Sequence, residues 1–187
     1  MRITGGYLKG KNIAILNDGV ARYTSSKIRE AVFDLIGDVK DSKVLDLFAG
    51  SGSFAIEALS RGAIFATCVE KEKGMTIVLK KNLEHLSLNK YCHVLNMDVR
   101  YAIRFLYKKA YSYDIIFMDP PYERGYIFKT MALLKNNIIY DRNTIFILEY
   151  SKREALDLSD LDGWDEVVTK RYGDTNIKIV RISEHII

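Results

Sequence analysis

The chain has 187 residues, of which 48% are hydrophobic and 28% are charged, and its formal net charge is +4. This length and composition are typical of one globular fold with a substantial core. No apolar run approaches the roughly 18 residues that span a bilayer, and the N-terminus is polar, so we expect a soluble, cytoplasmic protein. Two cysteines, and three histidines without ligand spacing, argue against a disulfide scaffold and against a metal site.

The positive charge is concentrated at the start of the chain. Residues 1–30 contain six cationic and two anionic side chains, and the rest of the chain is neutral in sum. A basic segment on a neutral body favours a polyanionic partner, because phosphate contacts supply most non-specific affinity for nucleic acid. A basic surface without a partner is the alternative, and charge alone does not decide between the two. The candidate nucleic-acid contacts are Lys9, Lys11, Arg22, Lys27 and Arg29.

A hairpin and a helix are predicted before the main fold. Residues 2–10 suggest a hairpin that turns at Gly5 and Gly6. A helix follows, with Thr24 or Ser25 as its N-cap and an apolar stripe between residues 28 and 36. The stripe comprises Ile28, Ala31, Val32, Leu35 and Ile36, and the opposite, exposed side carries Lys27, Arg29 and Glu30. We expect residues 1–40 to form a basic RNA-docking extension and residues 41–187 to form the catalytic domain.

From residue 43 onward, short apolar segments alternate with helical periodicity. Strands are predicted at residues 44–48, 64–69, 93–97, 115–118 and 144–148, with helices at 53–60, 72–86, 99–109 and 126–135. Two further strands, at 164–172 and 176–182, join as a hairpin across Gly173 and Asp174. Strict alternation of strand and helix is typical of a parallel sheet covered on both faces. The sequence therefore predicts an α/β fold with a doubly wound sheet that ends in a hairpin.

A glycine-containing turn follows the first predicted strand. Gly50 and Gly52 allow a tight turn and a close approach of the backbone to a ligand, and the following helix start offers free N–H groups. Together with Ala55 they also fit the dinucleotide fingerprint, and Glu70 stands where a ribose-binding carboxylate is expected. Both the glycine turn and the position of Glu70 therefore indicate a cofactor that contains a nucleoside.

Acidic residues at the strand ends separate the candidate cofactors. Asp46 precedes the glycine turn by four residues, where an anion repels a pyrophosphate but attracts an ammonium and a sulfonium group. This charge pattern favours S-adenosylmethionine, with Glu70 accepting from the ribose and Asp98 from the adenine amino group. Each acid alone could equally be a helix cap or a surface carboxylate. Three acidic residues at successive strand ends favour a binding site.

The fourth predicted strand ends in Asp119, Pro120, Pro121 and Tyr122, which include both prolines of the chain. Tandem prolines fix two backbone angles and leave rigid carbonyl acceptors. The simpler interpretation is that the two prolines only end the strand. A carboxylate and an aromatic ring around the prolines suit a planar base with an exocyclic amine. Asp119 and the Pro120 carbonyl would accept its N–H groups, and Tyr122 would stack on an extruded or unpaired base.

The chain resembles a known family through these motifs. Residues 45–52 (LDLFAGSG), 57–63, 69–71 and 119–122 are similar to those of the RsmD-type 16S ribosomal RNA guanine-N2 methyltransferases, and residues 2–11 and 22–33 match the family's leading hairpin and helix. The resemblance implies a Rossmann-like class I fold with a seven-stranded sheet whose last strand is antiparallel. The family has proline after the arginine equivalent to Arg22, where this chain has Tyr23, so the conformation of that loop is in doubt.

The resemblance also implies the activity and the site. S-Adenosylmethionine is the methyl donor, S-adenosylhomocysteine the product, and a guanine N2 in 16S rRNA the acceptor, within an assembling small ribosomal subunit. We expect a monomer without metal. The cofactor-binding residues implied are Asp46, Phe48, Gly50, Gly52, Glu70, Lys71 and Asp98, and residues 119–122 hold the target base.

Three other functions are compatible with parts of the sequence. A nicotinamide-dependent oxidoreductase would use the same glycine turn, but it gives no reason for Asp46 or for the double proline. A DNA adenine-N6 methyltransferase would share the motifs, but no segment is long enough for a separate target-recognition domain. A non-catalytic RNA-binding factor could retain the fold. The intact motif set favours the enzyme.

Overall fold

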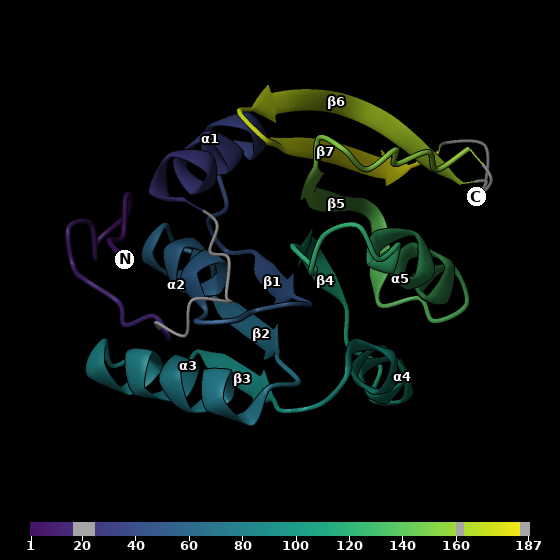
Figure 1. Cartoon of the computed structure of the whole chain (residues 1–187). Helices are drawn as coiled ribbons and strands as arrows, with labels where there is room; N and C mark the ends of the chain where they lie inside the picture. Colours follow the sequence, from purple (N-terminus) through teal and green to yellow (C-terminus); the bar gives the residue numbers. More distant parts are fainter. Residues whose placement is uncertain (17–24, 160–162, 184–187) are drawn as a thin grey trace.

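The computed structural model describes residues 1–16, 25–159 and 163–183. It contains one seven-stranded sheet with the order β3-β2-β1-β4-β5-β7-β6 (Figure 1). Strands β1 to β5 are parallel to one another, and β7 pairs antiparallel with both β5 and β6. The strands are β1 Lys43–Asp46, β2 Phe65–Val69, β3 Cys92–Leu95, β4 Tyr113–Met118, β5 Tyr140–Ser151, β6 Trp164–Tyr172 and β7 Thr175–Ile182. The predicted doubly wound sheet and its antiparallel end are confirmed.

Helices cover both faces of the sheet. They are α1 Ser26–Ile36, α2 Ser53–Ser60, α3 Lys73–His85, α4 Val99–Lys108 and α5 Tyr126–Lys135. Figure 1 shows α1, α2 and α3 on one face and α4 and α5 on the other. One buried cluster joins Val32, Phe54 and Leu79 from the first three helices, and a second joins Ile103 of α4 to Met131 of α5. None of the helices in the described ranges is long and apolar enough to cross a membrane.

Strands β1 and β5 end at different places from those predicted. Strand β1 stops at Asp46 because the chain turns there, and the Asp46 carboxylate accepts a hydrogen bond from the Phe48 amide. Strand β5 continues to Ser151, beyond the apolar run that ends at Leu148, because its last residues pair with the start of β7. The buried polar side chains Glu149 and Ser151 therefore belong to the sheet.

The N-terminal hairpin is wrong in detail. Its two sides do pair antiparallel, through a bridge between Arg2 and Asn12 and through backbone hydrogen bonds from Ile3 N to Lys11 O at 2.9 Å and from Ile13 N to Met1 O at 2.7 Å. The turn between them, however, spans residues 5–10, and no strand forms within the described residues before α1. The intervening loop packs on the end of α2, where the Tyr7 amide donates to the Ser60 carbonyl at 2.9 Å. Gly6 has a φ of +72°, and a Cβ there would lie 1.7 Å from that carbonyl oxygen. Close approach to α2 thus explains this glycine.

Arg29 does not lie on the exposed side of α1. Ser25 caps the helix as predicted, but the Arg29 side chain is fully buried and its Nε lies 3.1 Å from Glu57 Oε2 on α2. Glu57 also accepts from the Thr4 amide and pairs with Arg61. A buried guanidinium needs such a counterion. The prediction of Arg29 as an exposed RNA contact is therefore wrong, because its charge neutralises a buried carboxylate.

The leading segment and the α/β fold share one hydrophobic core. Ile3, Leu8 and Ile13 are buried in the same cluster as Val32 and Phe54. Asn82 of α3 adds a polar link, because its side chain exchanges two hydrogen bonds with the backbone of Ala14. The segment before α1 is thereby held against α2 and α3.

Candidate active site

The turn after β1, residues 47–52, is here called the glycine loop. It lies at the carboxyl edge of the sheet and leads directly into α2. Gly50 and Gly52 have φ values of 52° and 82°, in the left-handed region that favours glycine. A Cβ on Gly52 would lie 2.1 Å from Leu79 Cδ1 of α3, so this position also requires the missing side chain. The loop therefore presents backbone and the α2 N-terminus to the edge of the sheet.

Glu70 fixes the glycine loop from the neighbouring strand. Its Oε2 accepts from the Gly50 amide at 2.9 Å, and its Oε1 accepts from the Glu72 amide at 2.7 Å. The carboxylate is thus oriented by two backbone donors before any ligand arrives. Lys71 is exposed, with Nζ 3.7 Å from the Glu72 carboxylate.

Asp46 is the most perturbed acid of the site. Its side chain is buried, and this burial raises the pKa of its carboxyl group to about 8, helped by the nearby negative charges of Asp119 and Glu70. The hydrogen bond from the Phe48 amide opposes the shift. The structure therefore brings together three of the predicted acids, and their combined field favours a cationic ligand.

A small cavity of about 60 Å³ lies where these residues meet. It is lined by Asp46, by Phe48, Gly50 and Ser51 of the glycine loop, and by Asp119. The buried Ser51 hydroxyl has no hydrogen-bond partner among the described residues. An unsatisfied buried hydroxyl beside an acid of raised pKa fits a ligand that supplies both polar atoms and positive charge. The residues present thus fit the amino-acid end of S-adenosylmethionine.

Residues 119–122, the double-proline turn, leave β4 at the same edge. Asp119 is half-buried and lines the cavity beside the glycine loop, Pro120 is buried and Pro121 is exposed. The Tyr122 hydroxyl donates to Glu149 Oε1 at 3.2 Å and lies 3.3 Å from Thr175 Oγ1. The ring of Tyr122 is therefore held by β5 and β7.

Glu149 and Thr175 were not among the predicted site residues. Both are 2% exposed, and both contact the double-proline turn through Tyr122. Glu149 carried a usable signal, since it directly follows an apolar strand run, as the other site acids do. Thr175 carried none, because its place beside Tyr122 depends on the antiparallel pairing of β7 with β5.

Asp98 lies at the carboxyl edge after β3, where it caps α4. Its Oδ1 accepts from the Arg100 amide at 2.9 Å and from Arg100 Nε at 2.8 Å. Hydrogen bonding from Arg100 lowers the pKa of the Asp98 carboxyl group. A contact from Asp98 to adenine stays a prediction, and it would have to share this carboxylate with Arg100.

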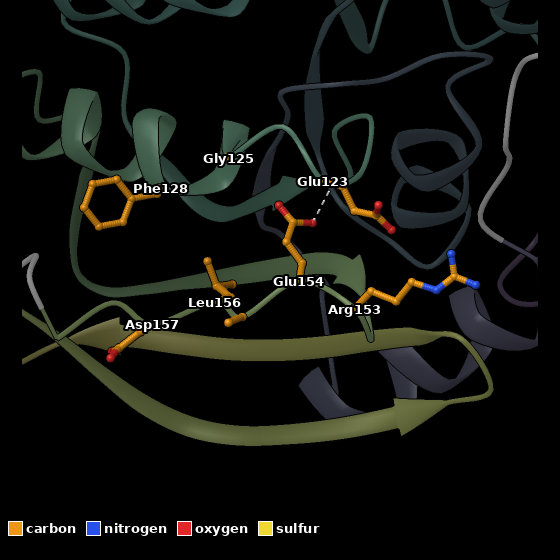
Figure 2. A pocket seen from close by; sticks show the side chains of 8 residues that line it. Glu123, Gly125, Phe128, Arg153, Glu154, Leu156 and Asp157 are labelled. Carbon is orange, nitrogen blue, oxygen red and sulfur yellow. Dashed lines mark hydrogen bonds between the residues drawn. The ribbon is translucent and has the colours of Figure 1, made fainter.

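A larger cavity of about 490 Å³ adjoins the double-proline turn (Figure 2). It lies between the residues that follow Tyr122 and the segment that follows β5, with Phe128 and Arg153 toward opposite ends. The Glu123 amide donates to the Glu154 carboxylate at 3.1 Å, which ties the two walls together. Its volume is within the range of small-molecule sites.

Of the predicted RNA-contacting cations, Lys9, Lys11 and Lys27 do not line these cavities. Lys9 and Lys11 are exposed on the loop that packs against α2, and Lys27 is exposed on α1. Arg22 and Tyr23 lie outside the described residues. No cluster of three or more metal-ligating side chains occurs within the ranges that the structure describes.

These observations define the class of the protein. A parallel sheet with an antiparallel seventh strand, a glycine loop after β1 and acids at the carboxyl edge form the Rossmann-like class I methyltransferase fold. Solved structures agree: a putative methyltransferase, YhhF, from Escherichia coli superposes with a TM-score of 0.84 at 29% identity, covering 98% of each chain. A putative methylase from Haemophilus influenzae, HI0767, gives 0.77 at 27% identity, again over 98% of each.

Sequence comparisons identify the family. A family model described as "Conserved hypothetical protein 95" matches residues 1–181. Ribosomal RNA small subunit methyltransferase D of Buchnera aphidicola subsp. Acyrthosiphon pisum is 37% identical over 155 residues, 82% of this chain and 80% of the relative. The enzyme of that name from Escherichia coli K12 is 36% identical over 138 residues, 73% of this chain and 68% of the relative. The chain belongs to this RsmD-type methyltransferase family.

Proposed function

We propose that this protein transfers a methyl group from S-adenosylmethionine to the exocyclic N2 amine of a guanine in 16S ribosomal RNA. One observation carries the proposal: Asp119 of the double-proline turn lines the same cavity as Asp46 and the glycine loop. A group held by the turn would therefore meet a cofactor held by the loop. The names of the relatives, which are ribosomal RNA small subunit methyltransferases, support the choice of substrate.

The cofactor-facing residues have complementary roles. Asp46 faces the ammonium and sulfonium groups of the cofactor, Gly50 and Gly52 let the backbone approach its amino-acid end, and Glu70 offers its carboxylate to the ribose hydroxyls. When bound, S-adenosylmethionine supplies an electrophilic methyl group on a sulfonium. Its positive charge lowers the pKa of Asp46, so binding favours the ionised carboxylate. In the free protein, burial is the main cause of the raised pKa of Asp46, and the nearby carboxylates of Asp119 and Glu70 add to it.

The double-proline turn acts on the acceptor. The guanine amine is a poor nucleophile because its lone pair is conjugated with the ring. Asp119 and the Pro120 carbonyl accept its two N–H bonds and aim the lone pair at the methyl carbon. As the N–C bond forms and the C–S bond breaks, positive charge develops on nitrogen beside Asp119. The amine proton then leaves to Asp119 or to water.

Tyr122 supplies the stacking surface for the guanine ring. A stacked base in a helix cannot present its amine to this cavity, so the target base is unpaired or extruded. The larger cavity beside Glu123 and Phe128 leaves room for the parts of the nucleotide that the turn does not hold. An assembling small subunit presents the rRNA, and its shape supplies much of the selectivity.

The test is transfer of labelled methyl groups. The protein is incubated with methyl-labelled S-adenosylmethionine and, separately, unmodified small ribosomal subunits, naked 16S rRNA and duplex DNA, and each product is digested to nucleosides. We expect label in N2-methylguanosine from subunits or from rRNA. The Asp119→Ala variant, which leaves the glycine loop intact, serves as the control and should transfer little label.

Other outcomes separate the alternatives. Label in N6-methyladenine from DNA would identify a DNA methyltransferase, and binding of a nicotinamide cofactor in place of S-adenosylmethionine would identify an oxidoreductase. Cofactor binding without any transfer to rRNA or subunits would contradict the proposed reaction and favour a non-catalytic RNA-binding factor.

A further inference from the structure

The two helices on one face of the sheet carry positive charge only. Helices α4 and α5 contain five lysine or arginine residues and no aspartate or glutamate. All five are exposed: Arg100, Arg104, Lys108, Lys129 and Lys135. The helices of the opposite face mix the two signs, with the acids Glu30, Asp34, Glu57 and Glu84 among them. Among the described helices, an exposed surface with positive charge only is therefore found on this face.

Charge and aromatic rings share one side of α4. At 3.6 residues per turn, Arg100, Arg104 and Lys108 recur about every 6 Å along the helix, and Tyr101 and Tyr107 fall beside them within an arc of about 120°. The two tyrosines are 61% and 50% exposed. The other side of the helix, with residues 102, 103 and 106, is buried. A stripe of cations flanked by exposed rings matches the two components of single-stranded nucleic acid, phosphates and bases.

Most of this charge is not neutralised by the protein. Arg100 pairs with Asp98 at 2.8 Å. No carboxylate among the described residues forms an ion pair with Arg104, Lys108, Lys129 or Lys135. Unpaired exposed cations raise the local concentration of a polyanion and release its counterions on contact.

The cationic face begins at the rim of the candidate active site. Helix α4 starts directly after Asp98 at the carboxyl edge of the sheet. Helix α5 starts at Tyr126, whose ring centroid is 6.1 Å from that of Phe48 in the glycine loop. Both helices run away from this edge and contact one another. A strand whose base occupies the site could therefore continue over the two helices.

We propose that this surface, formed by Arg104, Lys108, Lys129 and Lys135 with Tyr101 and Tyr107, binds the RNA backbone next to the target nucleotide. The inference rests on the proposed rRNA substrate and adds a docking surface to the basic segment at the start of the chain. The cations contact phosphates, and the tyrosines stack on unpaired bases. Arg100 is left out, because it is engaged by Asp98.

The test compares two triple variants with equal loss of charge. The first is Arg104→Gln, Lys108→Gln and Lys129→Gln, and the matched control on the opposite side is Lys80→Gln, Lys81→Gln and Lys90→Gln, all exposed. Binding of naked, unmodified 16S rRNA is measured against salt concentration. Each lost phosphate contact removes about 0.7 to 0.9 from the log–log slope. We expect a reduction of about 2 with at least tenfold weaker binding in the first variant, and little change in the control.

Two further readouts keep the test specific. S-Adenosylmethionine affinity should be unchanged in both triple variants, and Tyr101→Ala with Tyr107→Ala should weaken binding without changing the salt slope. An unchanged slope in the first variant, or an equal fall in the control, would overturn the docking surface. Weaker action on assembled subunits with unchanged binding to naked rRNA would assign the face to an acidic protein partner and would also overturn it.

Methyl transfer by the wild-type protein is measured in parallel. If the wild-type protein methylates rRNA while the first triple variant keeps the full slope, only the docking surface fails. If the wild-type protein neither binds nor methylates rRNA, the proposed function fails and the surface loses its RNA partner with it.

Discussion

The hydroxyl group of Tyr122 donates a hydrogen bond to Glu149 Oε1 at 3.2 Å, across 27 residues of sequence. This contact ties the double-proline turn after β4 to the end of the neighbouring strand β5. Because Glu149 is buried, water does not compete with the bond, and the aromatic ring is held in one orientation. The position of the ring that would stack on the target base is thus set from within the sheet.

Replacement of Glu149 by alanine should therefore lower kcat/KM for rRNA by about 10-fold to 100-fold, the worth of one hydrogen bond to a charged group. Glu149→Gln keeps an acceptor and should retain most activity. In a Tyr122→Phe background the alanine substitution should add little, since the bond is already absent. Kinetics of the four proteins check this. Additive losses in the double variant would show that Glu149 acts in some other way, and thermal unfolding reports any general damage.

Asp119→Ala should separate chemistry from cofactor binding. Asp119 reaches the small cavity from the double-proline turn after β4, whereas the glycine loop reaches it from β1 and is held by Glu70. We expect kcat to fall at least about 100-fold, as for the loss of one transition-state acceptor. The Kd for S-adenosylmethionine should rise much less than kcat falls, because Asp46 and Glu70 still supply negative charge to the site. Single-turnover transfer and calorimetric titration measure the two quantities; normal turnover would remove Asp119 from the proposed role.

Cofactor binding should release a proton from Asp46. In the free protein its pKa of about 8 keeps the carboxyl group largely protonated at pH 7, and a bound cation lowers that pKa. Affinity for S-adenosylmethionine should therefore rise between pH 6 and 8 and level off above. Calorimetry in buffers of different ionisation enthalpy counts the released protons. A binding enthalpy that does not depend on the buffer at pH 7 would contradict the assignment.

The same group should make stability fall as pH rises. The pKa of Asp46 is 3.8 in the unfolded chain and about 8 in the folded protein, so Asp46 ionises first in the unfolded state as the pH rises. The free energy of unfolding therefore falls by up to about 1.4 kcal/mol per pH unit between pH 4 and 8. The penalty is absent below pH 4 and complete above pH 8. Asp46→Asn should remove this dependence and raise the free energy of unfolding at pH 8. Urea unfolding at pH 5 and pH 8 compares the two proteins, and an identical pH dependence would rule out the raised pKa.

Replacement of Arg29 should lower the free energy of unfolding without changing RNA binding. Arg29→Met leaves the buried Glu57 carboxylate with one arginine partner fewer, a loss worth about 3 kcal/mol of unfolding free energy. The salt dependence of rRNA binding should not change, whereas Lys9→Gln, Lys11→Gln and Lys27→Gln together should reduce it. Denaturation and binding titrations distinguish the two sets. A reduced salt slope in the Arg29 variant would return this residue to the RNA interface.

Local sequence was sufficient for the elements that a single periodicity defines. Glu70 and Asp119 were predicted because each follows a buried parallel strand, and parallel strands end at one edge. Asp46 was predicted because it precedes the glycine turn by four residues. Arg29 was misplaced because its charge was taken as a sign of exposure. Its spacing from Val32, Phe33 and Ile36 fits the buried face of α1, but only the position of Glu57 on another helix explains how the charge is tolerated.

Features that depend on pairing between distant segments could not be predicted from local sequence patterns. The extension of β5 through Glu149 depends on β7, which inserts beside it from far along the chain. The N-terminal loop depends on Ser60, which accepts its backbone hydrogen bonds. In both places, the sequence suggests that the polar groups are exposed to solvent. In the structure, an element distant in sequence supplies their hydrogen-bond partners.

The contact between Tyr122 and Thr175 has a consequence for synthesis on the ribosome. Thr175 is the first residue of β7, and the residues around the glycine loop precede it by more than a hundred positions. A nascent chain can therefore assemble β1 to β4 and the glycine loop long before β7 emerges to cover the edge of β5. The part of the site that faces the cofactor would fold first. The part that binds the base would be completed only when the last hairpin forms.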